Sequence, residues 1–246
     1  MRVLVVGAAG IMGGHVINAV NRSGNECVAF VDIKYADGAG VNQYAKISDF
    51  KEKADVIIDF SFHGLTPEIL DYAVESSTPV IVATTGHTDD ERTAIFDASN
   101  KVAVFYSGNM SLGIATLCDV VKKVVSVFPD ADIEIIETHH NRKLDAPSGT
   151  AKMLFEAVKE VRPDAYANQG RNGICKRDKN EVGINSIRMG NIVGIHEVTI
   201  GTNTEQITLK HEAYDRALFA DGAIKAAEYM CGKGAGLYTM KELLKG

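Results

Sequence analysis

Residues 1–32, MRVLVVGAAGIMGGHVINAVNRSGNECVAFVD, carry the pattern that decides the fold of the first half of the chain. An apolar run at 3–6 leads into glycines at positions 7, 10 and 13, and a second apolar run at 27–31 ends at Asp32. Glycines at a strand-to-helix turn let the backbone approach a pyrophosphate, whose charge the helix N–H groups stabilise. Asp32 stands where an acidic group binds adenosine ribose hydroxyls. The stretch predicts a dinucleotide-binding unit, although its G-x-x-G-x-x-G spacing is one residue off the usual motif.

Short apolar runs continue to alternate with helical patterns as far as residue 127. Strands that are apolar throughout are buried on both faces, which is typical of a parallel sheet covered by helices. We therefore expect a Rossmann-type doubly wound parallel sheet. The further strands are expected at 56–60, 79–83 and 102–106, and the helices at 12–22, 67–75, 89–98 and 112–127.

The pattern of apolar and polar residues changes in the second half of the chain, where it predicts a second α+β domain with an open mixed sheet. Three runs alternate in the manner of strands, and the short turns at 190–191 and 201–204 suit hairpins. A polar loop is expected at 168–183, and the tail returns to helical patterns at 218–230 and 240–244. The domains are expected at 1–110 with 217–246, and at 111–216. The remaining elements are strands at 133–138, 184–189, 192–200 and 205–213, and a helix at 150–161.

Composition and charge exclude several classes of protein. The 246 residues are 46% hydrophobic and 24% charged, as in ordinary globular proteins, and the net charge of −6 argues against a non-specific nucleic-acid binder. No run reaches the length of a membrane span, and the first apolar run is too short for a signal-peptide core. The four cysteines have no Cys-x-x-Cys spacing, and we expect most of them to be small, reduced core residues. A cytoplasmic location without a membrane partner is the expectation.

The most informative stretch is 134–150, EIIETHHNRKLDAPSGT, in which a strand delivers two adjacent histidines to a loop with cations. In an extended strand, His139 and His140 point to opposite faces and do different work. Ser148 is a candidate helix N-cap, and the N–H groups of Gly149 and Thr150 suit a carboxylate or phosphate. An ordinary capped helix is the competing interpretation. The convergence of imidazoles, Lys143 and a helix start favours a small dianionic substrate.

These residues, together with the Gly7–Gly13 loop and the Thr84-Thr85-Gly86 turn, resemble the 4-hydroxy-tetrahydrodipicolinate reductase (dihydrodipicolinate reductase) family. The blocks at 190–196 and 216–223 extend the resemblance over essentially the whole chain. It implies NAD(P)H-dependent reduction of 4-hydroxy-tetrahydrodipicolinate with loss of water, in lysine and diaminopimelate biosynthesis. It also implies a homotetramer built through the sheets of the second domain.

The resemblance assigns roles residue by residue. His139 would donate or accept the proton and Lys143 would assist it, while His140, Ser148, Gly149 and Thr150 would bind the substrate carboxylates. Asp32 favours NADH, and Lys34 leaves NADPH usable because it offers a charge to the 2′-phosphate. The cofactor-binding residues are expected to be Gly7, Ala8, Ala9, Gly10, Ile11, Met12, Asp32, Lys34, Ala83, Thr84, Thr85, Ser107, Gly108, Asn109 and Met110.

The sequence departs from the usual family pattern after the second strand and before the Thr-Thr-Gly turn. Ala83 stands where the family often has glycine, and Ile33 where many members place an arginine. The segment between Asp32 and the strand at 56–60 is short, and we expect it to lack about one strand-helix unit.

Four alternative sites carry less weight. Tyr229 and Lys233 match the Tyr-x-x-x-Lys of short-chain dehydrogenases, but they lie at the end of the last long helix. Cys118 sits within an apolar helix and not where a dehydrogenase nucleophile is needed. A non-catalytic NAD sensor would not need His139, His140 and Lys143 together. A zinc site that uses His196 or His211 as well would match no familiar ligand spacing, so no metal is expected.

Overall fold

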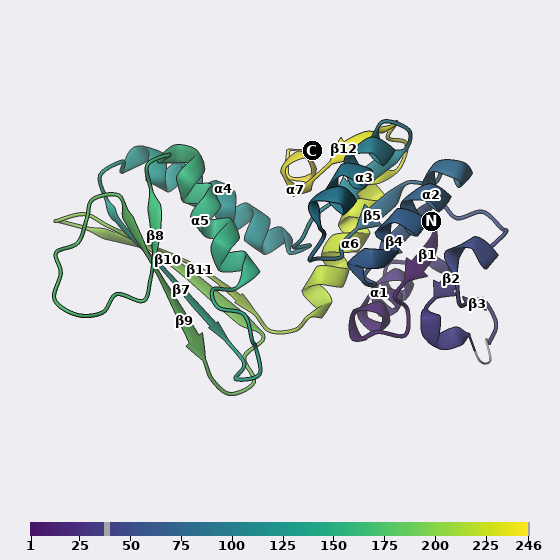
Figure 1. Ribbon diagram of the computed structural model, residues 1–246, viewed down its shortest axis with the longest axis horizontal. Helices are drawn as coiled ribbons and strands as arrows, with labels where there is room; N and C mark the ends of the chain where they lie inside the picture. Colours follow the sequence, from purple (N-terminus) through teal and green to yellow (C-terminus); the bar gives the residue numbers. More distant parts are fainter. Residues whose placement is uncertain (37–39, 246) are drawn as a thin grey trace. The chain divides into compact units, whose positions relative to one another are not determined.

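The computed structural model describes residues 1–36 and 40–245, which form two compact units. The first unit holds residues 1–111 and 216–246, and the second holds residues 112–215. As Figure 1 shows, the chain enters the second unit with α4 (Leu112–Val127) and has returned to the first at α6 (Ala217–Met230).

A parallel sheet in the order β12-β6-β5-β4-β1-β2-β3 forms the centre of the first unit. Alternate strand residues such as Leu4 and Ile57 pack with Ile69 and Ile95 of α2 and α3, which leaves the intervening residues facing the opposite side. On that opposite side of the sheet, α1 and α6 pack on each other. The strands are β1 (Arg2–Val6), β2 (Glu26–Val31), β3 (Gln43–Tyr44), β4 (Val56–Asp59), β5 (Val80–Val82), β6 (Ala103–Tyr106) and β12 (Gly236–Tyr238). The helices are α1 (Ile11–Arg22), α2 (Thr66–Ser76), α3 (Asp89–Ser99), α6 and α7 (Met240–Leu243), with 3-10 turns η1 (Ile33–Tyr35), η2 (Ile47–Asp49) and η3 (His63–Leu65).

The sheet confirms the predicted doubly wound fold and adds two strands that the sequence pattern did not indicate. β3 has only two residues, and its Gln43 pairs with Phe30 of β2. The short segment after Asp32 therefore keeps a strand and replaces the helix with 3-10 turns, although residues 37–39 lie outside the described residues. β12 joins the far edge beside β6. Both strands are too short to display a period-two pattern.

The second unit is a mixed sheet in the order β11-β10-β7-β9-β8, with α4 and α5 on one side (Figure 1). Ile133 and Ile135 of β7 are fully buried against the helices, together with Val198 of β10. Glu137 and His139 follow on the same face, because successive strand residues alternate sides. The bounds are β7 (Asp132–His139), α5 (Gly149–Val161), β8 (Tyr166–Gln169), β9 (Glu181–Arg188), β10 (Gly194–Gly201) and β11 (Gln206–Ala213).

Strand pairing in the second unit corrects one of the two predicted hairpins. β10 and β11 pair as an antiparallel hairpin through 201–204, as expected. β9 and β10 do not pair with each other: β7 lies between them, parallel to β9 and antiparallel to β10. A period-two pattern indicates a strand but not its neighbour. The predicted loop at 168–183 also proves too long, since β8 extends to Gln169 and β9 starts at Glu181.

The cysteines are free, but they are less buried than expected. Cys175 and Cys231 are exposed, and Cys27 and Cys118 are only half-buried, so the expectation that most are core residues is wrong. Burial raises the pKa of Cys118 to about 11, which keeps its thiol protonated near neutrality. This state does not suit a dehydrogenase nucleophile.

Candidate active site

The glycine loop between β1 and α1 contains approaches that only glycine permits. Gly7 has a φ of +79°, and a Cβ on Gly13 would lie 2.2 Å from the carbonyl oxygen of Gly7. Gly10 is the N-cap of α1, where no side chain caps the helix and no acidic residue occupies the first turn. The backbone therefore leaves a cradle for an anionic group at the helix N-terminus, which fits a dinucleotide pyrophosphate. Ala8 is buried in the loop, Ala9 and Met12 are half-buried, and Ile11 is exposed.

Asp32 ties the glycine loop to the end of β2. Its carboxylate accepts from the backbone N–H groups of Ala9 and Lys34, each at 3.0 Å. A carboxylate has about four lone-pair positions, so acceptor capacity remains for ribose hydroxyls. Asp32, Gly7 and Gly10 line a cavity of about 430 Å³ together with Val6 of β1, Val31 of β2 and Phe60, which follows β4.

Two lysines, Lys34 and Lys46, are candidates for the charge beside this cavity. The ammonium of Lys34 lies 3.5 Å from the carbonyl oxygen of Ala9, whereas Lys46 lines the cavity next to Asp32 and Ile33. Lys46 is contributed by the chain just before η2, a segment that sequence reasoning expected only to be short. No local motif marks Lys46, because the pairing of β3 with β2 brings its segment to the end of β2.

The other predicted cofactor residues lie at the carboxyl ends of β5 and β6. Thr84 is buried, and its hydroxyl donates to Asp59 at 3.0 Å, while Thr85 is exposed. Burial raises the pKa of Asp59 even though Ser61 and Thr84 donate hydrogen bonds to it. Asp59, which sequence reasoning missed, therefore fixes the turn after β5 to the end of β4. Ala83 is buried, Ser107 is half-buried and donates to the carbonyl of Asn109, Gly108 is exposed, and Met110 is buried.

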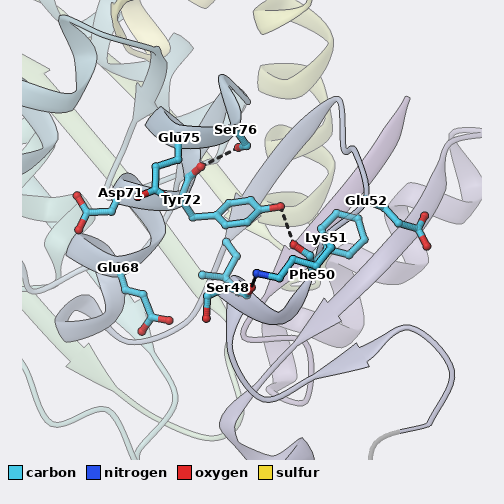
Figure 2. A pocket seen from close by; sticks show the side chains of 10 residues that line it. Ser48, Phe50, Lys51, Glu52, Glu68, Asp71, Tyr72, Glu75 and Ser76 are labelled. Carbon is cyan, nitrogen blue, oxygen red and sulfur yellow. Dashed lines mark hydrogen bonds between the residues drawn. The ribbon is translucent and has the colours of Figure 1, made fainter.

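A second hollow in the first unit has the wrong charge for a dinucleotide. Figure 2 shows this hollow of about 590 Å³ between η2 and α2, with Tyr72 at its centre donating to the carbonyl of Phe50. Carboxylates dominate its lining and would repel phosphates. The charged lining residues are Lys51, Glu52, Glu68, Asp71 and Glu75.

In the second unit, a buried charge cluster surrounds His139. His139 Nδ1 lies 2.5 Å from Oε2 of Glu137, and Arg188 donates to both oxygens of Glu137 at 2.8 and 2.7 Å. Glu137 is fully buried and His139 is 8% exposed. Burial opposes the charge of Glu137, but hydrogen bonds from His139, Arg188 and Ser186 prevail and hold the pKa of Glu137 well below its usual range. The carboxylate is therefore ionised, and His139 Nδ1 carries a proton toward it.

The start of α5 lies against this cluster. Ser148 is confirmed as the N-cap: its Oγ accepts from the N–H of Ala151 at 3.1 Å, and its own N–H donates to Glu137 Oε1 at 3.1 Å. The Ser148 side chain is buried, whereas Gly149 is exposed and Thr150 half-buried. The helix N-terminus that faces solvent is therefore formed by the two residues that follow the cap.

Lys143 and His140, the other side chains assigned to the substrate in this segment, have different surroundings. Lys143 pairs with Asp145 at 2.8 Å, and its N–H donates to the carbonyl of His140. His140 lies beyond the end of β7 and is half-buried, with its N–H donating to Ile192. His139, at the end of the strand, is buried, so the structure gives the adjacent histidines different environments.

His196 of β10 completes the cluster and was not assigned a role from the sequence. Its Nε2 lies 3.1 Å from Ser148 Oγ, and its ring meets that of His139 edge to face at 5.1 Å between centroids. Burial, followed by the nearby His139, lowers the pKa of His196 to about 3, so this ring is neutral at physiological pH. His196 stands opposite Glu137 and Arg188 stands opposite His139 in the strand pairing, a relation that no local motif reveals.

Models of a known family match both parts of the chain. The N-terminal model of dihydrodipicolinate reductase matches residues 1–110 and the C-terminal model matches residues 113–244. The 4-hydroxy-tetrahydrodipicolinate reductase of Clostridium novyi (strain NT) is 42% identical over 99% of this chain and 98% of its own length. That of Caldanaerobacter subterraneus subsp. tengcongensis is 40% identical over 100% and 98%.

The chain belongs to the dihydrodipicolinate reductase family. The family resemblance expected from residues 137–150 is thereby confirmed. A dipicolinate-bound dihydrodipicolinate reductase from Paenisporosarcina sp. TG-14 has the same fold, with a TM-score of 0.81 over 97% of each chain at 23% identity. An amine dehydrogenase from Mycobacterium smegmatis is more distant, with a TM-score of 0.66 at 10% identity over 98% and 95%.

Membership in the dihydrodipicolinate reductase family removes the short-chain dehydrogenase alternative. Tyr229 and Lys233 lie at the end of α6, where the Lys233 ammonium sits 4.4 Å from the centre of the Tyr229 ring. This contact is a cation–π pair and stabilises the end of the helix. Among residues 1–36 and 40–245, no helix is both long and apolar enough to cross a membrane.

Proposed function

We propose that this chain reduces 4-hydroxy-tetrahydrodipicolinate to tetrahydrodipicolinate with loss of water, in lysine and diaminopimelate biosynthesis. The observation that carries the proposal is the cluster of Glu137, His139 and the α5 N-terminus in a member of the dihydrodipicolinate reductase family. His139 can donate a proton, and the N–H groups at the start of α5 can bind a carboxylate. Together they suit a small dicarboxylate substrate.

The first unit is proposed to bind the nicotinamide cofactor, which supplies hydride when bound. The cradle at Gly7–Met12 would hold the pyrophosphate, and Asp32 would accept from the adenosine ribose. The residues at the ends of β5 and β6, Ala83–Thr85 and Ser107–Met110, would contact the nicotinamide half of the cofactor. The acceptor capacity left on Asp32 supports NADH as the preferred cofactor, with NADPH also used.

The second unit is proposed to bind the substrate and handle the proton. His139 would exchange a proton with the substrate through Nε2, because Nδ1 is engaged with Glu137. An imidazole ring has one nitrogen that can donate a proton and one that can accept it, which suits general acid–base work. Lys143 would assist proton transfer, and its ammonium is held by Asp145 at 2.8 Å. The N–H groups of Gly149 and Thr150, with His140, would bind carboxylates.

Assembly and location are part of the proposal. A homotetramer would form through the sheet of the second unit, on the face away from α4 and α5. Exposed side chains of Thr208, Lys210 and Glu212 along β11 leave that face open to a second copy. The enzyme would work in the cytoplasm.

The proposed reaction is tested by mixing the purified chain with NADH and freshly generated 4-hydroxy-tetrahydrodipicolinate and following loss of the reduced-nicotinamide absorbance. Oxidation that depends on substrate, with tetrahydrodipicolinate as the product, is expected. Absence of turnover with either NADH or NADPH would contradict the proposal.

A further inference from the structure

Glu137 has more structural partners than a surface carboxylate would need. It lies on β7 two residues before His139, fully buried on the face that packs against α4 and α5. Oε2 receives His139 Nδ1 and one Arg188 nitrogen, while Oε1 receives the other Arg188 nitrogen and the Ser148 N–H. One carboxylate therefore contacts both the histidine and the first residue of the α5 cap.

Arg188 makes this burial possible. A buried carboxylate is costly unless it is paired and hydrogen-bonded, and the fork of Arg188 supplies both. Arg188 stands opposite His139 in the pairing of β9 with β7, and it also donates to the carbonyl of Asp145 at 2.7 Å. The same guanidinium thus anchors the loop that carries Lys143.

We infer that Glu137 is a positioning residue that sets the tautomer of His139 and holds the α5 N-terminus in place relative to it. The inference rests on the proposed function and goes beyond it, because Glu137 is fully buried and acts through His139 and Ser148. An ionised carboxylate can only accept, so Nδ1 keeps its proton and Nε2 is left to serve the reacting centre. Gly194 leaves room at that nitrogen, since a Cβ there would come within 3.1 Å of Nε2.

His196 provides an independent brace between the same two parts. Its Nε2 contacts Ser148 Oγ at 3.1 Å, while its ring packs edge to face on His139. Ser148 is thereby held by Glu137 through its N–H and by His196 through its hydroxyl. The histidine and the carboxylate-binding helix start consequently move as one body, which is the preorganisation that positioned proton transfer requires.

The two functions of Glu137 are separable by substitution. Glu137→Gln retains an oxygen for the Ser148 N–H but places an amide donor toward His139, so the tautomer should change while substrate binding is retained. Glu137→Ala removes both acceptors, so KM for substrate should rise as well. We expect kcat to fall about 10²-fold or more in both variants, the lower end of what positioned acid–base catalysis contributes.

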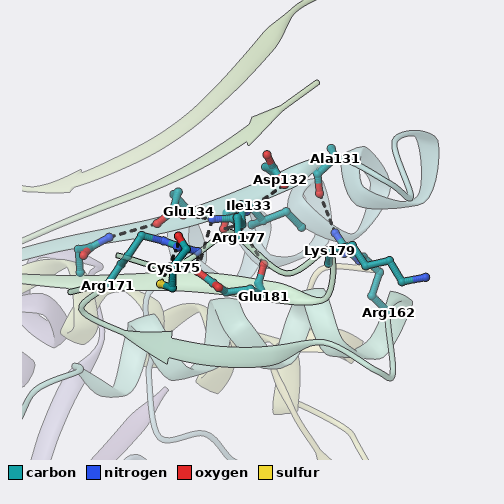
Figure 3. A network of polar contacts seen from close by, with 11 residues as sticks. Ala131, Asp132, Ile133, Glu134, Arg162, Arg171, Cys175, Arg177, Lys179 and Glu181 are labelled. Carbon is teal, nitrogen blue, oxygen red and sulfur yellow. Dashed lines mark hydrogen bonds and ion pairs between the residues drawn. The ribbon is translucent and has the colours of Figure 1, made fainter. Parts of the chain in front are cut away.

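A matched control lies in the same unit. Figure 3 shows a second carboxylate–arginine network, in which Arg171 pairs with buried Glu181 and Arg177 pairs with Asp132 and Glu134. Glu181→Gln removes a buried charge of the same kind at the opposite end of β9 from Arg188. It should lower the free energy of unfolding without changing kcat, KM or the state of His139.

The decisive readout is the ring of His139 in histidine-labelled ¹⁵N NMR, with assignment by His139→Gln. The parent should show an Nδ1-bound proton shifted to low field by the 2.5 Å contact with Glu137, and Glu137→Gln should lose it. Should the uncompensated Arg188 prevent folding, Glu137→Gln combined with Arg188→Gln removes both charges and is measured in the same way.

The outcomes separate this inference from the proposed function. If Glu137→Gln keeps the low-field proton and turns over within about threefold of the parent, the positioning role is wrong. If Glu181→Gln lowers kcat as much as Glu137→Gln, the effect is general destabilisation and the inference is again overturned. If the parent never turns over the substrate but its NMR pattern responds to Glu137→Gln, the proposed function fails while the contact to His139 stands.

Discussion

At the scale of single residues, His139 and Lys143 carry the proposed chemistry, and their surroundings differ. His139 is buried against a carboxylate, whereas Lys143 is held by a pair with the exposed Asp145. Neither residue belongs to the unit that holds the glycine loop. Substitutions at these two positions should therefore affect turnover and not dinucleotide affinity.

His139→Gln and Lys143→Ala are each expected to lower kcat by about 10²–10⁴-fold, because positioned proton transfer contributes that much. The Kd for NADH, measured by fluorescence titration, should stay that of the parent. Glu181→Gln serves as the control for effects of stability. Turnover within about threefold of the parent in both variants would remove His139 and Lys143 from these roles.

Cofactor choice is also decided by single residues, with Asp32 favouring NADH. Lys46→Ala is expected to weaken NADPH binding by about fivefold, the upper range for an exposed ion pair, and Lys34→Ala by less. The reason is that Lys46 lines the cavity beside Asp32, while the Lys34 ammonium lies toward the carbonyl of Ala9. NADH binding should hardly change. Titrations at fixed ionic strength test this, and a parent that prefers NADPH tenfold would contradict the role of Asp32.

At the scale of elements, the packing of α1 against the glycine loop requires glycine at position 13, whereas position 14 has room for a side chain. A Cβ on Gly13 would collide with the carbonyl of Gly7 at 2.2 Å, whereas nothing lies within 4 Å of a Cβ on Gly14. Gly13→Ala should therefore lower the free energy of unfolding by about 1–3 kcal/mol. Gly14→Ala should raise it by roughly 0.5–1 kcal/mol through helix propensity. Chemical denaturation measures both, and equal effects would show that the loop adapts.

The N-terminus of α5 is the corresponding element on the substrate side. Thr150→Val keeps the shape of the side chain but removes its hydroxyl, so KM for substrate should rise by roughly tenfold or more, since one hydrogen bond to a charged group contributes about 1.5–3 kcal/mol. The Kd for NADH should not change. Unchanged KM together with weaker NADH binding would instead place this helix on the cofactor side.

At the scale of the whole molecule, buried titratable groups make stability depend on pH. The pKa of His196 falls from its usual 6.5 to about 3 through burial, so the unfolded chain takes up a proton between these values and the folded chain does not. The lowered pKa of Glu137 acts in the same direction once the pH falls through the ordinary carboxyl range. Acid therefore destabilises the fold.

We expect the free energy of unfolding to fall as the pH is lowered from 6.5 toward 3, with His196 contributing at most about 1.4 kcal/mol per pH unit. Denaturant titrations at a series of pH values measure this slope. His196→Gln should flatten the part between pH 6.5 and 5, where carboxyl groups contribute little. An unaltered slope in that variant would show that His196 is protonated in the folded chain.

The predictions that the structure confirms rest on local sequence patterns. The glycines before α1, the apolar runs of β1, β4 and β5 and the Ser148 cap were readable because each depends on neighbours a few residues away. Glu137 could also have been identified, since it lies two residues before His139 and period two places both on one face. The cysteines were misjudged because an apolar neighbourhood in sequence does not require burial at that position.

Short-range periodicity and contiguous motifs were enough to predict the doubly wound half, the family and the segment that holds His139 and Lys143. Three other features depend on the folded chain: β7 separates β9 from β10, Arg188 neutralises Glu137, and Lys46 lines the same cavity as Asp32. Strand order and charge pairing join residues that are far apart along the chain, and a strand's pattern of side chains is compatible with several neighbours. Burial selects among those neighbours, and burial is a property of the assembled fold.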